Sequence, residues 1–363
     1  MMAAATATRM PWWAWVWPTL AWALLIAAVV GGKSNLLAAA AAGAMVATVF
    51  SAVYHAEVVA LRVGEPLGTL ILAVVVTVIE VALIVSVMLG SGAEPSALAR
   101  DTVFAAVMLV CNGVVGLCLL VGGIRHHEQG FQVEGASAAL AVLAALTTLT
   151  LIVPNYTTSA AGPAFSASQL AFAGVMSLIL YGVFVFVQTV RHRDYFIWER
   201  NEGQDDHAER PTGRFTLLST ALLIAALTAV VLIAKLESPI LDAGVAWVGA
   251  PKPVVGIVIA ALVLLPEGLA ALRAARANRL QTSLNLALGS AIASIGLTIP
   301  TVAAVSIFIG QPLALGLGTK EEVLLALTLL VGVITLGNGR TTVLQGAVHL
   351  VILAAFLFLA VVP

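Results

Sequence analysis

The feature that most constrains this chain is a series of apolar stretches, each near twenty residues long, separated by short charged or Gly- and Pro-containing breaks. A helix of about 20 apolar residues crosses the hydrocarbon core of a membrane, and the period-2 alternation of a membrane β-barrel is absent from these stretches. Charged residues make up only 10% of the chain, whereas about a quarter is usual in soluble domains. The sequence therefore predicts an all-α polytopic membrane protein.

Eleven stretches qualify as transmembrane helices. They cover residues 13–31, 35–55, 66–90, 102–122, 136–154, 167–190, 215–235, 253–273, 283–309, 321–337 and 343–362. The first begins in a tryptophan-rich segment typical of a membrane interface, so we expect it to be retained rather than cleaved as a signal peptide. Cys111 and Cys118 fall within one span and predict neither a disulfide framework nor a zinc site.

The charges on the loops predict the orientation of the chain. With an odd number of spans, twelve of the 17 Lys and Arg residues fall on the side of the N-terminus and five on the other side. The positive-inside rule then places the N-terminus in the cytoplasm. A net charge of −1 gives no reason to expect a nucleic-acid partner.

One long hydrophilic connection, residues 191–214, divides the chain. It is a cytoplasmic acidic linker by the count above. After one N-terminal helix in residues 1–34, five spans precede the linker in residues 35–190 and five follow it in residues 215–363. Because five is odd, two similar halves have opposite orientations. This is the inverted-repeat plan of many secondary transporters.

Each half carries one glutamate within the apolar part of a span, and in both halves it is the second span. These residues are Glu80 and Glu267. A charged side chain at the centre of a spanning helix costs about 2.5–3.5 kcal/mol. Lys and Arg occur only at the ends of predicted spans, so protons or a bound cation are the expected counter-charges. Desolvation and a second carboxylate both favour protonation, while Ca²⁺ with its six to eight oxygen ligands would compete for the pair.

Further oxygen ligands are expected near the two glutamates. Thr77 lies one turn before Glu80, and Pro266 frees the carbonyl of Leu262, four residues earlier. The third span of each half is rich in small and polar residues, which act either as ligands or only as interhelical packing residues. The expected cation- or proton-binding residues are Glu80, Glu267, Thr77, Leu262, Asn112, Asn285 and Ser290. The alternative for each glutamate is a protonated acid that makes one interhelical hydrogen bond.

Several segments together resemble one family. They are Y-H-A-E-V-V-A-L-R-V-G-E-P-L-G-T-L at residues 54–70, V-I-E-V at 78–81, A-R-D-T at 99–102, L-P-E-G-L at 265–269, N-L-A-L-G-S-A-I-A-S at 285–294 and G-N-G-R-T-T-V-L-Q-G-A-V-H-L at 337–350. Over nearly the whole chain the sequence resembles the calcium/cation exchangers, specifically the bacterial ChaA-type cation/proton antiporters.

The resemblance implies that Glu80 and Glu267 bind the transported cation, in the bacterial cytoplasmic (inner) membrane, without a cofactor. The family's common G-N-x-x-E signature is not kept. Val76 and Thr77 stand where its Gly and Asn occur, as do Val263 and Leu264 in the second half. Calcium, sodium and potassium therefore all stay open as the cation.

Residues near the ends of spans are expected along an access path. They are Asp101, His55, Glu57 and Glu65. Asp101 opens the fourth span, where its first expected role is a helix N-cap. His349, inside the last span, either relays protons or packs as a neutral imidazole.

The expected function is a secondary antiporter that extrudes a cation, Ca²⁺ first, in exchange for protons, and its partners are these ions and the lipid bilayer. The first alternative is a Na⁺/H⁺ or K⁺/H⁺ antiporter on the same fold. A membrane-embedded hydrolase is the alternative of another class, but neither H-E-x-x-H nor G-x-S-x-G is present. Oligomeric state and regulation by the loop around Asp205 and Asp206 stay open.

Overall fold

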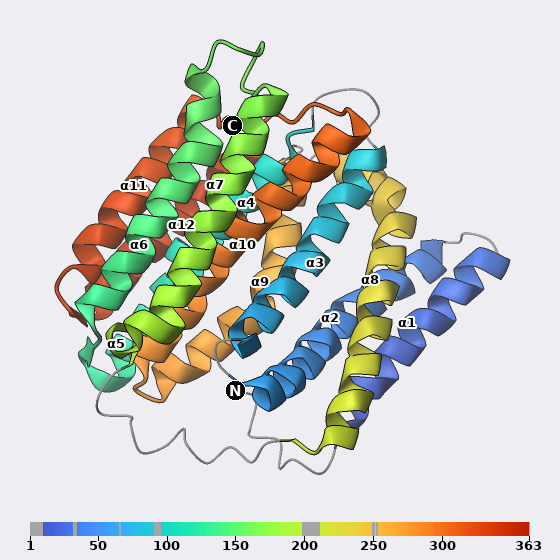
Figure 1. Cartoon of the computed structure of the whole chain (residues 1–363), viewed down its shortest axis with the longest axis horizontal. Coiled ribbons are helices and arrows are strands. Elements are labelled where there is room, and N and C mark those ends of the chain that lie inside the picture. Colours follow the sequence, from blue (N-terminus) through green and yellow to red (C-terminus); the bar gives the residue numbers. More distant parts are fainter. Residues whose placement is uncertain are drawn as a thin grey trace. The chain divides into compact units, whose positions relative to one another are not determined.

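The computed structural model describes residues 10–31, 35–64, 67–90, 96–197, 211–248, 251 and 253–362. These residues are almost entirely helical (Figure 1). In chain order the elements are α1 (Trp12–Gly31), α2 (Asn35–Val63), α3 (Leu67–Gly90), α4 (Leu98–Met108), the π-helix η1 (Leu109–Val114), α5 (Val115–His126), β1 (Gln129–Gly130), α6 (Val133–Thr147), the π-helix η2 (Thr148–Ile152), the 3₁₀-helix η3 (Val153–Tyr156), α7 (Ala167–Phe186), the π-helix η4 (Val187–Arg191), the 3₁₀-helix η5 (Arg193–Phe196), α8 (Gly213–Val248), α9 (Pro253–Arg276), α10 (Leu280–Ile309), α11 (Thr319–Leu336), β2 (Arg340–Thr341) and α12 (Val343–Val361).

A helix stands at each of the eleven predicted spans. Within the described residues, nine helical segments are long and apolar enough to cross a membrane, and α3 contributes a shorter apolar stretch, Leu70–Ser86. The predicted all-α polytopic membrane fold is confirmed, whereas the number of eleven crossings stays a prediction. Glu65, Asp205 and Asp206 lie outside the described residues, as does most of the acidic linker.

Two helices run well past their predicted ends. Helix α2 ends at Val63, whereas the sequence predicted an end at residue 55. Helix α8 ends at Val248, whereas the sequence predicted an end at residue 235. The predicted ends were wrong because they followed the loss of apolar character. Charged residues leave the apolar part of a span without ending the helix, and Arg62 in the last turn of α2 complements the helix dipole there.

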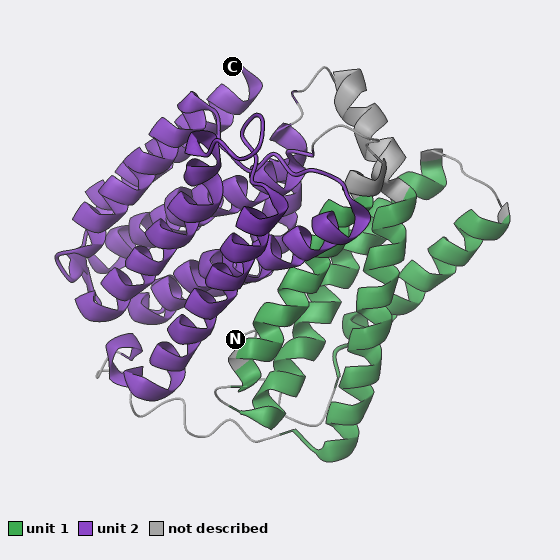
Figure 2. Cartoon of the chain, turned by 45° about the horizontal axis from the view of Figure 1, so that its top comes forward, with its two compact units in different colours: residues 1–92, 206–250 green, residues 93–205, 251–363 purple. Residues whose placement is uncertain are grey.

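The chain divides into two compact units (Figure 2). Unit 1 consists of residues 1–92 and 206–250, and unit 2 of residues 93–205 and 251–363. In unit 1, α2 packs along α1, α3 and α8, and both α1 and α3 also contact α8.

A proline explains the contact between α1 and α2. Pro18 lies inside α1 and has no backbone N–H, so the carbonyl of Ala14 lacks its helical partner. Two side chains of α2 donate to this carbonyl oxygen instead: Ser51 Oγ at 2.5 Å and His55 Nε2 at 2.9 Å. The freed carbonyl thus becomes a buried polar link between the helices.

Unit 2 contains the remaining spans. In it, α10 packs against α7, α9 and α6, α4 packs against α9, and α12 packs along α5. At position 346 of α12 a β-carbon would lie 2.4 Å from the backbone nitrogen of Leu120, so the absence of a side chain at Gly346 allows α5 and α12 to approach closely.

The two ends of unit 2 differ in charge. At one end β1 pairs antiparallel with β2, Arg340 pairs with Glu128 at 3.3 Å, and the ring of His126 lies 3.1 Å from the carbonyl of Arg276. At the other end the loop before α11 is held by Arg100, which donates to the carbonyl of Gly316 at 3.1 Å. The last turns of α5 and α9 bring Arg125, Arg273 and Arg276 to the β1–β2 end as well, so arginines are concentrated there.

Three spans of the described chain contain a π-helix: η1 follows α4, η2 follows α6 and η4 follows α7. A π-helix inserts an extra residue per turn and is frequent at functional sites. Only η1 lies in the middle of a buried span, between α4 and α5. It is therefore the π-helix that bears most directly on the site.

Candidate functional site

Glu80 lies in unit 1, on α3. Its side chain is 2% exposed, and Thr77, one turn earlier, is 7% exposed. Both residues therefore lie on a buried face of α3, the helix that packs against α2 and α8. A carboxyl group enclosed in this way favours the protonated form or a bound cation.

Glu267 lies in unit 2, on α9. It is half-buried, as is Leu262, and α9 continues as one helix through Pro266. Gly268, the next residue, lies against the side chain of Val114 in η1. Glu267 is thus adjacent to the contact between α9 and the π-helix. The two glutamates belong to different units, so their joint coordination of one ion stays a prediction.

Asn112 of η1 is fully buried and is part of a polar network in unit 2. Its amide nitrogen donates to Thr328 Oγ1 of α11 at 2.9 Å, and its amide oxygen lies 3.2 Å from Nδ1 of His349 on α12. The other ring nitrogen of His349 lies 3.2 Å from Thr335 Oγ1.

The geometry assigns the donors of this network. Because the amide oxygen of Asn112 can only accept, Nδ1 of His349 is the nitrogen that carries the proton. The hydroxyl of Thr335 donates to the unprotonated Nε2 and can accept from it if His349 binds a second proton. Neither threonine was singled out from the sequence, which gave no spacing signal linking α11 to Asn112.

Asn285 and Ser290 lie on α10. The amide oxygen of Asn285 accepts from Gln281 at 2.9 Å, and its amide nitrogen donates to the carbonyl of Phe196 at 2.6 Å. Asn285 therefore links α10 to the 3₁₀-helix η5. Ser290 is half-buried nearly three turns into the same helix. For both residues the role as a cation ligand stays a prediction.

The residues expected on an access path occupy different environments. His55 is fully buried and holds the carbonyl of Ala14, while Glu57 is half-buried on α2. Asp101 is not the N-cap of its span, because α4 begins earlier, at Leu98, and the backbone N–H of Asp101 already bonds to the carbonyl of Ala97 at 2.9 Å. Its carboxylate instead accepts from Arg100 Nε at 2.8 Å.

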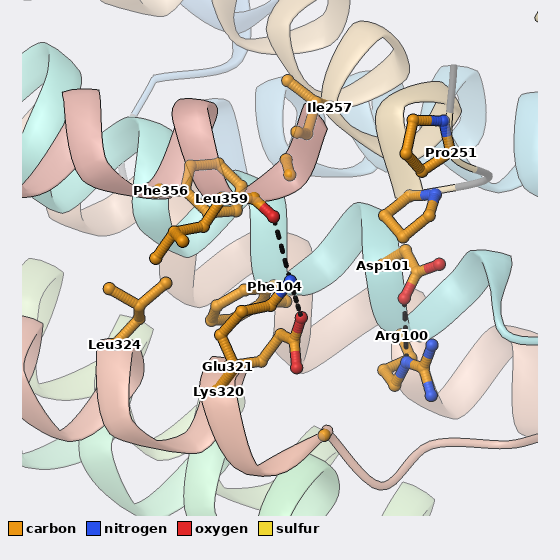
Figure 3. A pocket seen from close by; sticks show the side chains of 13 residues that line it. Arg100, Asp101, Phe104, Pro251, Ile257, Lys320, Glu321, Leu324, Phe356 and Leu359 are labelled. Carbon is orange, nitrogen blue, oxygen red and sulfur yellow. Dashed lines mark hydrogen bonds and ion pairs between the residues drawn. The ribbon is translucent and has the colours of Figure 1, made fainter. Parts of the chain in front are cut away.

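Asp101 lines a pocket at the end of unit 2 that is opposite to β1 and β2 (Figure 3). The pocket holds about 190 Å³ of space between the starts of α4, α9 and α11 and the end of α12. Among the described residues, no group of three or more His, Cys, Asp or Glu side chains is arranged to hold a metal.

Apolar helices of membrane-spanning length, with one enclosed acid on α3 and a half-buried acid on α9, are typical of a membrane transporter. Two segments, residues 33–190 and 218–362, match the family model described as "Sodium/calcium exchanger protein". The chain belongs to the sodium/calcium exchanger family, within which it is an antiporter of the ChaA type. It is accordingly a transporter and not an enzyme, and the predicted resemblance is confirmed.

Individual relatives agree with the family. A protein of Sinorhizobium fredii (strain NBRC 101917 / NGR234), y4hA, which is named as an ionic transporter without a stated ion, is 52% identical over 358 residues, 98% of this chain and 97% of that protein. The sodium-potassium/proton antiporter ChaA of Escherichia coli (strain K12) is 36% identical over 316 residues, 86% of this chain and 85% of that protein. The structure of native YfkE matches with a TM-score of 0.72 at 17% identity, covering 96% of this chain and all of that chain, and so shows a shared fold.

Proposed function

We propose that this exchanger extrudes Ca²⁺ from the cytoplasm in exchange for protons, and that the two ions compete for Glu80 and Glu267. The observation that carries the proposal is the matching placement of the two acids. Glu80 lies 47 residues after the start of the first family segment at residue 33, and Glu267 lies 49 residues after the start of the second at residue 218. One acid within an apolar helix of each segment is what a site shared between two halves requires.

Packing within unit 2 supports two related halves, residues 35–190 and 215–363. The fifth span of the first half, α7, packs along α10, which is the third span of the second half. The fifth span of the second half, α12, packs along α5, which belongs to the third span of the first half. This reciprocal pairing is expected of two inverted repeats related by a two-fold axis.

Charge balance favours a divalent ion. Two carboxylates cancel the charge of one Ca²⁺, and the same two groups carry two protons on the return step, so the exchange is electroneutral. YfkE is itself a Ca²⁺/H⁺ antiporter, which supports calcium as the first cation to test for a chain of this fold.

The orientation proposed is an N-terminus in the cytoplasm of a bacterium, with the chain in the inner membrane. In unit 2 the β1–β2 end carries Arg125, Arg273, Arg276 and Arg340, whereas the pocket end carries Arg100 and Lys320. The positive-inside rule makes the β1–β2 end cytoplasmic. That assignment supports the same orientation as the loop count over the whole chain.

The second candidate is exchange of Na⁺ or K⁺ for protons at the same glutamates. The name of the Escherichia coli relative favours it, since ChaA is a sodium-potassium/proton antiporter and is 36% identical to this chain. The departures from G-N-x-x-E before both glutamates also favour a changed cation preference.

Everted membrane vesicles test both candidates. After respiration acidifies the vesicle interior, added cation that exchanges for protons relieves the quenching of a pH-sensitive dye. We expect recovery with Ca²⁺ and its loss in both Glu80→Gln and Glu267→Gln, while Glu134→Gln, at an exposed glutamate of α6, leaves it unchanged. Recovery with Na⁺ or K⁺ but not Ca²⁺ would select the second candidate. Full recovery in both Glu80→Gln and Glu267→Gln would refute the proposed site.

A further inference from the structure

The pocket at the extracytoplasmic end of unit 2 is built from four helices and has an apolar wall with a charged rim (Figure 3). Phe104 of α4, Ile257 of α9 and Leu324 of α11 lie in the wall, with Phe356 of α12. The rings of Phe104 and Phe356 meet edge to face with their centroids 5.5 Å apart. This ring pair joins α4 to α12 at the pocket.

The rim carries two acids and two bases. Asp101 pairs with Arg100 at 2.8 Å, and Glu321 pairs with Lys320 at 3.4 Å. Each base is also fixed to a backbone carbonyl, Arg100 to Gly316 at 3.1 Å and Lys320 to Leu359 at 2.9 Å. The formal charge of the four groups is zero, so the rim as a whole does not trap a cation, and any attraction of a cation or proton to Asp101 or Glu321 acts only at short range.

The pocket lies directly on the helix that carries Glu267. A β-carbon at position 256 would lie 2.8 Å from the backbone of Asp101, so Gly256 allows α4 and α9 to touch at the pocket. Ile257, in the pocket wall, precedes Glu267 by ten residues, which is about 15 Å along a helix.

Further into unit 2 from the ring pair, the spans α4–η1, α11 and α12 carry the next buried polar groups. Asn112 follows Phe104 by eight residues, about 12 Å, and His349 precedes Phe356 by seven, about 10 Å. On α11, Thr328 follows Leu324 by one turn and accepts from Asn112. The pocket and the polar network are therefore aligned along the seam of α4–η1, α11 and α12.

We propose that this pocket is the extracytoplasmic vestibule of the exchanger, in which Asp101 and Glu321 receive cations and protons at the outer end of that seam. The proposal rests on the exchange function and the orientation proposed above. The proposal also gives a role to Asp101. Neither its place in the first turn of α4 nor its pairing with Arg100 requires that role. The charged groups that face the vestibule from the described parts of α4 and α11 are Arg100, Asp101, Lys320 and Glu321.

Cysteine labelling tests whether the pocket is open to water. Ile257→Cys places a thiol in the wall, and Val258→Cys is the matched control, since Val258 is 55% exposed on the same helix but does not line the pocket. The native thiols, Cys111 and Cys118, are both buried and supply the background. A membrane-impermeant, positively charged methanethiosulfonate is added to the extracytoplasmic face of right-side-out vesicles, and exchange is then measured.

We expect Ile257→Cys to be modified and to lose most of its exchange, while Val258→Cys and the wild type react little and keep theirs. An unreactive Ile257→Cys, or a fully modified one that exchanges at the unmodified rate, would overturn the vestibule. If the wild type itself exchanged no ions, the proposed function would fail, but the labelling of Ile257→Cys would still report whether the pocket holds water.

Two isosteric variants test the role of the acids. Asp101→Asn and Glu321→Gln are each expected to raise the KM for Ca²⁺ added to the extracytoplasmic face in the reverse direction, with kcat retained, and Asp101→Glu should recover part of the affinity. An unchanged KM in both variants would contradict the assignment. A loss of kcat alone would also contradict it, because a residue with only a structural role lowers the amount of active protein without a selective effect on KM.

Discussion

Gly346 is a position where a single methyl group should disturb the packing of α5 against α12 in unit 2. A β-carbon there would lie 2.4 Å from the backbone nitrogen of Leu120 and 2.8 Å from the carbonyl oxygen of Gly116. Ordinary contacts begin near 3.4 Å. Gly346→Ala therefore forces α12 away from α5 by about 1 Å, the difference between 2.4 and 3.4 Å, because helix backbone atoms cannot rotate aside.

This displacement reaches the buried network. His349 lies three residues further on the same helix face, and its 3.2 Å bond to Asn112 lengthens to about 4 Å, beyond hydrogen-bonding distance. Interhelical hydrogen bonds in membranes contribute about 0.6 kcal/mol on average and up to about 1.7 kcal/mol. A gap of about 1 Å also removes up to about half of the attraction of each packing contact. We expect the free energy of unfolding to fall by about 2 kcal/mol.

Thermal unfolding of the detergent-purified protein measures the effect with a thiol-reactive fluorescent dye. Cys111 and Cys118 are buried native probes, and Cys118 lies two residues from Gly116 on α5. Gly182→Ala on α7 is the control, because a β-carbon there meets nothing within 4 Å. It should melt at the wild-type temperature or slightly higher, since alanine favours a helix by about 1 kcal/mol over glycine. If Gly346→Ala melted together with the wild type, the close approach of α5 and α12 would be refuted.

Two further variants probe contacts that fix loops and helices. Ser51→Ala should destabilise the protein by about 0.6–1.7 kcal/mol, because the carbonyl of Ala14 loses one of its two side-chain donors. Adding Pro18→Ala should recover most of that loss in the same melting assay, since alanine restores the missing helical N–H; an additive double variant would argue against this explanation. Asn155→Ala removes the 2.6 Å hydrogen bond to the carbonyl of Leu317, so the backbone amides of residues 311–318 should exchange their hydrogens for deuterium faster. An unchanged rate of amide exchange would show that another contact holds this loop.

The length of the apolar stretches was enough to predict which segments are helical, because an apolar run near 20 residues that crosses a membrane must satisfy its own backbone hydrogen bonds as a helix. It could not predict where α2 and α8 end, since helices continue into water. It also could not predict the π-helices: η1 packs against α9, α10 and α12, which are distant in sequence, and no local sequence signal marks it.

Glu80 and Glu267 were identifiable from sequence because charge in an apolar span is costly whichever helices surround it. The partners of the other polar residues were not. Asn112 and His349 meet across 237 positions of sequence, and Asn285 meets Phe196 across 89. The link from His55 to Ala14 was nevertheless within reach, because Pro18 follows Ala14 by four residues and frees its carbonyl, as Pro266 was expected to do for Leu262.

The most direct test of the account is the binding of Ca²⁺ to the purified protein, measured by calorimetry between pH 6 and pH 8 together with the protons released into weak buffer. Competition at Glu80 and Glu267 predicts that the dissociation constant rises as pH falls, by up to about 100-fold per pH unit where both carboxyls are protonated, with about two protons released per ion. Glu80→Gln and Glu267→Gln should each abolish binding and its proton release. Calcium binding of wild-type strength in both variants, or binding that does not change with pH, would contradict the claim that these two acids are the shared site.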